Sequence, residues 1–437
     1  MSSINIIARI DDGDDFLIDS PFIDYYLNNN KIFTYTFWNY DYSNLPNFVS
    51  NTGLDLFYIS LIVFGIDRIN SRESTLDGWS RNFKLFLPVL DLDRWKENKS
   101  YLENMLNFLS GDSWVLEFRK REVTRYEREV KEKIVNSKGG KLDINKICMF
   151  SGGLDSFIGV INLLEQEKPS DVLFVSHYGG GKGVVEYQNI LNENLRSEYN
   201  LDEDNFYSFY ASAKNGVEDT TRTRSFMFFA HAIVLATTMK RRIKLIIPEN
   251  GLISLNIPLT NSRIGSSSTR TTHPYYMKLL QQLIWNLDLE VDLENPYQFK
   301  TKGEMIQECE NKSFLKENIV NTMSCSHPDQ GRMKGDKVTS HCGNCLPCAI
   351  RRASLLKANI KDKSTYRDID FTSGPTARIN LMSYNIGIEK FNEKYSFLKI
   401  QNSGPIDKNI DEFVGVYNRG IKEFSDFLEA FNEAVLS

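Results

Sequence analysis

From residue 147 onward, short apolar segments alternate with segments of helical periodicity, and this alternation limits the possible folds more than any other feature. The apolar segments cover 147–150, 172–175, 206–210 and 245–247, and the helical patterns cover 155–166, 184–199, 224–240 and 274–287. Strands that alternate with helices form parallel sheets, because each helix returns the chain across the sheet by a right-handed crossover. We therefore predict an α/β domain whose ligands bind beyond the carboxyl ends of its strands.

Three parts of the chain differ in composition. Residues 1–140 are rich in aromatic side chains and end near a polar segment, Ser137–Lys141, that is typical of a linker. We predict an independent α+β domain of unassigned role there, followed by the α/β domain at 141–358. Residues 359–437 are expected to form a C-terminal extension that is partly helical, with a helix around 411–434.

Charge and hydropathy exclude several classes of protein. The net charge of the 437 residues is −5, so no overall basic field favours nucleic acid as a direct ligand. The longest apolar run, 57–66, is too short to cross a bilayer, and the first residues do not resemble a secretory signal. We expect a cytoplasmic protein without a membrane partner. Because thiols stay reduced in the cytoplasm, clustered cysteines there indicate a metal site before disulfides.

A glycine-rich hexapeptide directly follows the first predicted strand of the α/β domain and precedes its first helix. It consists of Ser151, Gly152, Gly153, Leu154, Asp155 and Ser156. Glycines let the backbone approach a phosphate closely, and a helix N-terminus offers free N–H groups and the positive end of a dipole. The hydroxyls can add donors, and Asp155 can hold the turn or help to position Mg²⁺. We predict an ATP-binding loop; the alternative is a serine-capped helix after a glycine turn.

Four of the six cysteines lie close together in the sequence: Cys325, Cys342, Cys345 and Cys348. Tight Cys-x-x-Cys turns direct thiolates to one centre, and a more distant fourth cysteine completes a tetrahedron. Four protein ligands leave no open position, so we predict a structural zinc ion. An iron–sulfur cluster is the main alternative, because a Cys-x-x-Cys-x-x-Cys run also suits clusters. Four unconnected reduced cysteines are the other.

The order of these motifs resembles the 7-cyano-7-deazaguanine synthase (QueC) family of PP-loop ATP pyrophosphatases. The hexapeptide, the stretch Thr301-Lys302-x-Glu304 and the block from Cys325 to Arg351 follow the order of that family, over about half of the chain. The resemblance implies a Rossmann-type PP-loop domain, of the adenine nucleotide alpha-hydrolase kind, with the zinc close to the substrate pocket. It also implies a C–N ligase. In that family ATP adenylates 7-carboxy-7-deazaguanine, ammonia displaces AMP to give an amide, and a second ATP dehydrates the amide to a nitrile.

The resemblance also suggests roles for individual side chains. The residues that we expect to take part in catalysis are Ser151, Asp155, Ser156, Arg224 and Lys302. Arg224 and Lys302 would neutralise the phosphates of ATP; a surface arginine and a solvated lysine at a helix start are the alternatives. Glu249 and Asn250 follow the fourth predicted strand and could read the guanine-like edge of the substrate, or simply form a polar turn.

The chain departs from the biosynthetic family at several places. Phe157 and Ile158 follow the hexapeptide where the family has small polar residues, and the parts at 1–140 and 359–437 are additional. These departures are similar to the QueC-like QatC proteins of bacterial antiphage systems, which implies a small modified protein, an ATPase and a nuclease as partners. The adenylated acid would then pass to an amine on a partner protein instead of ammonia. A non-catalytic nucleotide-binding scaffold or sensor and a PP-loop enzyme that modifies tRNA are the remaining alternatives.

Overall fold

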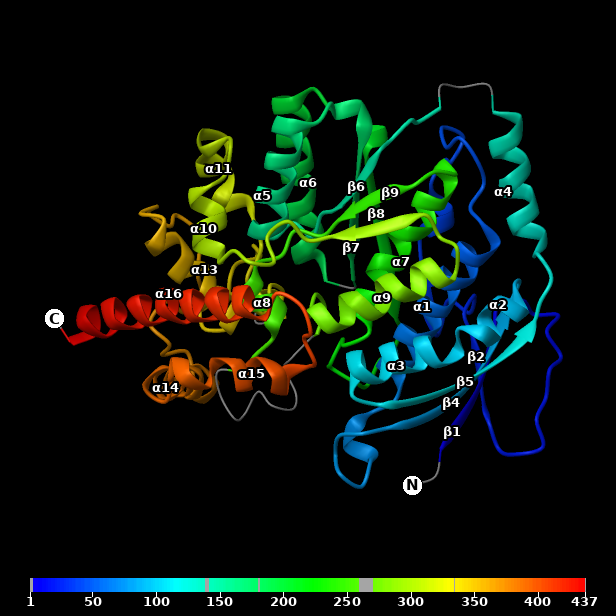
Figure 1. The fold of residues 1–437 in the computed structure, drawn as a ribbon, viewed down its shortest axis with the longest axis horizontal. Helices are drawn as coiled ribbons and strands as arrows, with labels where there is room; N and C mark the ends of the chain where they lie inside the picture. Colours follow the sequence, from blue (N-terminus) through cyan, green and yellow to red (C-terminus); the bar gives the residue numbers. More distant parts are fainter. Residues whose placement is uncertain (1–2, 138–140, 180, 259–269, 334, 437) are drawn as a thin grey trace.

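The computed structural model describes residues 3–436 except 138–140, 180, 259–269 and 334. Its centre is a six-stranded sheet in the order β10-β9-β6-β7-β8-β3 (Figure 1). The strands are β3 (Phe33–Tyr35), β6 (Lys146–Met149), β7 (Val172–Tyr178), β8 (Phe206–Ala213), β9 (Ile243–Ile246) and β10 (Val291–Glu294). All neighbours are parallel except β3, which is antiparallel to β8. The predicted α/β class is therefore confirmed.

Helices cover both faces of this sheet. Ile147 and Met149 of β6 belong to one core cluster with α7 (Arg224–Ala236) and α9 (Pro274–Asn286). Cys148 belongs to a second cluster with α5 (Leu154–Gln166) and part of α6 (Lys182–Tyr199). Successive side chains of a strand point to opposite faces, and both faces are covered here. The strands therefore read as continuous apolar runs in the sequence.

The first 140 residues differ from the expected independent α+β domain. The strands β1 (Ile4–Arg9), β2 (Ile23–Tyr26), β4 (Asn82–Val89) and β5 (Ser113–Lys120) form an all-parallel sheet in the order β2-β1-β4-β5. The helices that accompany it are α1 (Asn51–Ile69), α2 (Leu92–Glu97), α3 (Lys99–Ser110) and α4 (Arg125–Asn136). Parallel strands joined through helices make this sheet α/β in character.

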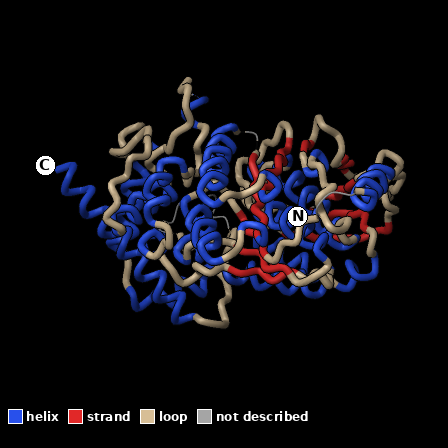
Figure 2. The backbone as a smooth tube through the Cα atoms, turned by 90° about the horizontal axis from the view of Figure 1, so that it is seen from above, coloured by secondary structure: helices blue, strands red, loops and turns tan. Residues whose placement is uncertain are grey.

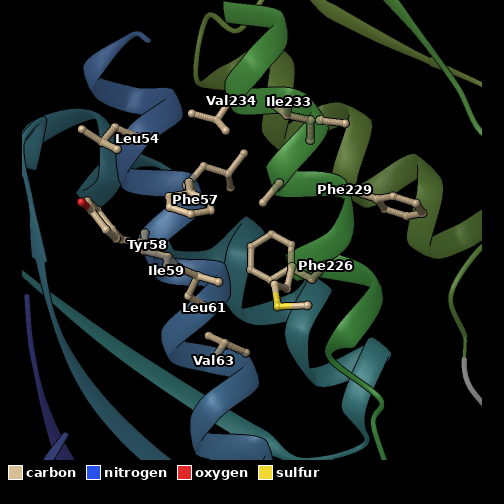
Figure 3. Close-up of a cluster of buried hydrophobic side chains, with 14 of the residues drawn as sticks. Leu54, Phe57, Tyr58, Ile59, Leu61, Val63, Phe226, Phe229, Ile233 and Val234 are labelled. Carbon is tan, nitrogen blue, oxygen red and sulfur yellow. The ribbon is translucent and has the colours of Figure 1, made fainter. Parts of the chain in front are cut away.

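This part of the chain is also not independent. The strand β3 leaves it and pairs with β8, with Phe33 opposite Ala213. The apolar helix α1 packs against α7, where side chains such as Phe57 and Phe226 lie in one buried cluster (Figure 3). One core therefore extends from the first sheet to the central sheet, and the expectation of a self-contained domain ending at residue 140 is corrected.

The remaining elements are mostly helical. They are α8 (Gly251–Leu255), α10 (Lys302–Gln307), α11 (Lys312–Asn318), α12 (Gln330–Met333), α13 (Leu346–Lys357), α14 (Pro375–Glu389), α15 (Ser396–Ser403) and α16 (Ile410–Leu436). The helix α16 packs against α8 and α13, which confirms the helix predicted around 411–434. Strands lie in the half of the molecule that contains the N-terminus, and helices form the C-terminal end (Figure 2). No helix in the described ranges has both the length and the apolar character needed to cross a membrane.

Candidate functional site

The glycine-rich hexapeptide forms the turn between β6 and α5. Gly152 has φ +80°, and a Cβ atom there would lie 2.9 Å from Cγ of Gln188, so only glycine fits without strain. The helix α5 starts after Gly153 without a side-chain cap. The hydroxyls of Ser151 and Ser156 lie 3.0 Å apart at this end of the helix. A helix N-terminus that begins with a glycine and is flanked by two hydroxyls is suited to binding an anion.

The hexapeptide lies at a topological switch point of the sheet. The chain continues from β6 to β7 and β8 on one side, and later adds β9 and β10 on the other side. At such a point the connections after two neighbouring strands diverge and leave a crevice beyond their carboxyl ends. Here the connections that follow β6 and β9 meet through Asn250, whose Nδ2 donates to Oδ2 of Asp155 at 2.6 Å. The predicted ligand position therefore coincides with the switch point.

Two carboxyl groups and a lysine form a buried cluster in this crevice. Nζ of Lys302 lies 3.0 Å from Oδ1 of Asp155, and both side chains are about 7 % exposed. Burial alone would raise the pKa of Asp155, but the charge of Lys302 and hydrogen bonds from Glu249 and Asn250 outweigh burial and hold the pKa below its ordinary value. Burial and the neighbouring Asp155 raise the pKa of Glu249 well above its ordinary range. The pKa values of the two carboxyl groups are therefore shifted in opposite directions.

The side chain of Asn250 is engaged entirely within the protein. Its Oδ1 accepts from the backbone N–H of Ile253 at 3.0 Å and caps α8. Its Nδ2 donates to Asp155 and, at 3.3 Å, to Oε1 of Glu249. These contacts make Asn250 a bridge between the two connections, and they do not support the expectation that it reads a substrate edge.

Arg224 reaches the crevice indirectly. Its Nε donates to Nδ1 of His177 at 3.3 Å, and burial lowers the pKa of both groups, so this imidazole is a neutral acceptor. Gln188 then joins His177 to the hexapeptide, because its Nε2 donates to the carbonyl oxygens of Ser151 at 3.0 Å and His177 at 3.3 Å. Gln188 was not predicted from the sequence, since a single glutamine within a helix carries no motif.

The N-terminus of α7, where Arg224 lies, is held by the first part of the chain. Asp67 at the end of α1 is fully buried and accepts from the backbone N–H of Thr223 at 3.2 Å and from its hydroxyl at 2.8 Å. Arg81 neutralises Asp67 through an ion pair of 2.5 Å. Residues before position 140 therefore determine where Arg224 lies.

The four cysteines come together as predicted. The Sγ atoms of Cys325, Cys342, Cys345 and Cys348 all lie within 4.8 Å of one another. The backbone N–H of Cys342 donates to Sγ of Cys325, and that of Cys345 to Sγ of Cys342, at 3.3 and 3.4 Å. Such N–H···S contacts stabilise thiolates, so the cluster can hold a metal ion.

The cysteine module contacts the hexapeptide directly. The backbone N–H of Met323 donates to the carbonyl oxygen of Gly152 at 2.8 Å, and that of Leu154 lies 3.4 Å from the hydroxyl of Ser324. Both contacts come from the two residues that precede Cys325. The cysteine module and the glycine-rich hexapeptide therefore form one structural unit.

The geometry brings most of the predicted residues together. Asp155, Glu249, Asn250 and Lys302 form one cluster next to Ser151 and Ser156, and Arg224 joins through His177 and Gln188. No protein-family model matches the chain. No curated protein matches it either.

Proposed function

We propose that this chain binds ATP at residues 151–156 and uses it to adenylate a carboxylic acid, with release of pyrophosphate. The observation that carries the proposal is the cluster of Asp155, Glu249 and Lys302 beside the glycine-initiated N-terminus of α5. A buried lysine and two carboxyl groups at the switch point of a parallel sheet are typical of a site that handles phosphate and a divalent cation.

The residues present fit a bound Mg²⁺. Asp155 Oδ1 is buried and has no hydrogen-bond partner among the described residues, although Lys302 lies within ion-pairing distance. Carboxylate oxygens are the ligands that Mg²⁺ prefers, so Asp155 would hold it. The ion would help to neutralise the charge that develops on the leaving pyrophosphate.

Different residues act on different parts of ATP during adenylation. The N–H groups at the start of α5 and the hydroxyls of Ser151 and Ser156 bind the β- and γ-phosphates. A carboxylate oxygen of the substrate attacks the α-phosphorus, the bond to the bridging oxygen breaks, and pyrophosphate leaves with its electrons. Lys302 stabilises this leaving group. Arg224 extends the positive potential toward the entering acid.

The substrate class follows from the resemblance described above. We propose 7-carboxy-7-deazaguanine or a close analogue as the acid, and a nitrogen nucleophile that displaces AMP to give an amide. That nucleophile is ammonia, with subsequent nitrile formation, or an amine on a partner protein in an antiphage system. Glu249 remains the residue proposed to contact the heterocycle, because it lies in the crevice while Asn250 is engaged elsewhere.

We also propose zinc as the metal of the cysteine cluster. Zinc–sulfur bonds of about 2.3 Å in a tetrahedron place sulfur atoms about 3.8 Å apart. The Sγ atoms of Cys342 and Cys348 lie 3.9 Å apart, and those of Cys325 and Cys345 lie 4.0 Å apart. A cubic iron–sulfur cluster holds each thiolate on a different iron atom and spreads them further. Metal analysis of purified protein should give one zinc per chain and no iron; a brown protein with iron absorption would contradict this assignment.

The test of the function is product analysis by mass spectrometry. Purified protein is incubated with Mg-ATP, 7-carboxy-7-deazaguanine and ammonium, with and without candidate partner proteins. AMP that forms only when the acid is present supports adenylation, and the amide, nitrile or protein adduct identifies the nucleophile. ATP binding without AMP for any such acid would contradict the proposal and favour the scaffold. AMP formation that depends on tRNA would favour the tRNA-modifying class.

A further inference from the structure

The C-terminal extension exposes a concentration of apolar side chains. Among the described residues, twenty large apolar side chains are exposed, and six of them lie within residues 379–398. These six, which we call the 379–398 patch, are Ile379, Met382, Ile386, Tyr395, Phe397 and Leu398. Their exposed fractions run from 42 % to 64 %. Exposed apolar patches of this extent on a folded surface mark interaction sites.

The 379–398 patch lies on α14, on the short 3-10 helix Glu393–Tyr395 and on α15. On α14, Ala377 and Tyr384 are buried, and the ring of Tyr384 packs edge-on to that of Phe424 of α16. Ile379, Met382 and Ile386 follow the i, i+3, i+7 spacing of one helical face, about half a turn away from the buried one. Both α14 and α15 pack on α16, and Ile388 at the end of α14 packs against the cluster that contains Ile400 of α15 (Figure 1).

The charges on α14 are arranged to match a second copy of the same helix. Ten residues, 379–388, carry no charge, although α14 is a surface helix. Arg378 precedes this segment and Glu389 follows it, and neither forms an ion pair within the described part of the chain. Glu389 lies eleven positions after Arg378, which is close to three helical turns or about 16 Å, so both lie on one flank of the apolar stripe. Two α14 helices crossing antiparallel near Met382 would bring Arg378 of each copy to Glu389 of the other.

The area is sufficient for a stable dimer. At roughly 200 Å² for a fully exposed large side chain, the 379–398 patch offers about 650 Å² per copy. Only half of this area lies on α14, so Tyr395, Phe397 and Leu398 must also take part. Two copies would then bury about 1,300 Å², which lies within the range of specific protein–protein interfaces. Antiparallel packing also pairs opposite helix dipoles. A different partner protein would not require opposite charges at the two ends of the stripe.

We propose that the 379–398 patch is the interface of a two-fold symmetric homodimer. In it α14 packs antiparallel against α14 of a second copy, and Tyr395, Phe397 and Leu398 of each copy complete the contact. The interface is independent of the adenylation proposed above, since none of its residues belongs to the crevice. An interface of this size is expected to dissociate at concentrations on the order of micromolar.

The first test measures the mass of the full chain in solution by analytical ultracentrifugation over a concentration series. The wild type should reach the mass of a dimer, and Met382→Glu should remain monomeric because it places a charge at the centre of the interface. Leu76→Glu is the matched control, because Leu76 is 92 % exposed outside the patch; this variant should dimerise like the wild type. A wild type that stays monomeric well above micromolar concentrations would overturn the proposal, even if another protein bound the patch. Unchanged dimerisation of Met382→Glu would overturn it too.

Charge reversal tests the antiparallel register. Arg378→Glu and Glu389→Arg should each weaken the dimer by roughly tenfold, since each reversal replaces two attractive contacts with two repulsive ones. An equimolar mixture of these two variants should recover wild-type affinity, because the heterodimer restores opposite charges at both ends. Both variants change only exposed side chains, so folding is preserved and can be checked by circular dichroism. A mixture no tighter than the separate variants would contradict the proposed register.

Discussion

The buried pair of Lys302 and Asp155 makes a prediction that separates the proposed site from an ordinary surface contact. Replacing Lys302 by methionine keeps most of the side-chain volume and leaves Asp155 without its cation. Breaking a buried ion pair by removing one partner is destabilising by about 3–5 kcal/mol. Lys300→Met is the matched control, because Lys300 lies two residues earlier and pairs with Glu308 on the surface, where both side chains are more than one third exposed. Loss of that surface pair should change stability by about 0–1 kcal/mol.

The stability lost in Lys302→Met should depend on pH, and the direction of that dependence follows from the pKa of Asp155. In the wild type the pKa of Asp155 is lowered, so its contribution to stability is present above the unfolded-state pKa and is lost as pH falls through the folded-state value. Without Lys302, burial raises this pKa, and the group then favours the folded state only at low pH and loses that contribution as pH rises. The loss in free energy of unfolding caused by Lys302→Met should therefore be larger at about pH 8 than at about pH 5. These two values lie on either side of the range in which a buried carboxyl titrates.

The assay is urea unfolding followed by circular dichroism and tryptophan fluorescence at both pH values, with ATP binding measured by calorimetry. Lys302→Met should lower the midpoint without changing the urea dependence of the transition, and should no longer bind ATP. Lys300→Met should behave like the wild type in both measurements. Equal effects of the two substitutions, or a deficit that does not change with pH, would refute the account of this cluster.

Three further predictions concern the loop, the second carboxyl group and the metal. Gly152→Ala should abolish ATP binding and be destabilising by about 1–2 kcal/mol, because the positive φ of Gly152 and its contact with Gln188 exclude a Cβ. Calorimetry and urea unfolding check both effects, and unaltered ATP affinity would contradict the prediction. Glu249→Gln should reduce AMP formation but increase stability at alkaline pH. The pKa of Glu249 is raised in the folded protein, so the wild type loses stability as pH rises through that pKa. A variant that is less stable than the wild type at alkaline pH would contradict this prediction. Removing the metal with a chelator, or substituting Cys345→Ser, should lower ATP affinity as well as stability, because Met323 and Ser324 connect the cysteine module to the loop; a metal-free protein that binds ATP normally would separate the two sites.

The parts of the site that follow a local pattern could be predicted from the sequence. A strand, a glycine turn and a helix in direct succession indicate the anion-binding loop, and the spacing of Cys342, Cys345 and Cys348 indicates the metal cluster. Both depend on residues close together in the chain, where backbone geometry limits the arrangement. The alternation of strands and helices likewise predicted the α/β class.

The long-range pairings could not be predicted in the same way. The strand β3 has only three residues, and nothing in Phe33–Tyr35 indicates pairing with β8 far along the chain. The engagement of Asn250 and the bridge through Gln188 depend on which loops meet at the switch point. The first 140 residues suggested an α+β domain, because a strand pattern in the sequence does not show whether its neighbours run parallel or antiparallel.

Pyrophosphate–ATP exchange tests the central claim most directly. The protein is incubated with ATP, Mg²⁺, labelled pyrophosphate and 7-carboxy-7-deazaguanine without any nitrogen nucleophile. The account predicts that label enters ATP only when the acid is present, because adenylation is reversible until the nucleophile arrives, and that Lys302→Met abolishes the exchange. Absence of exchange with wild-type protein that binds both ATP and the acid would contradict adenylation at this site.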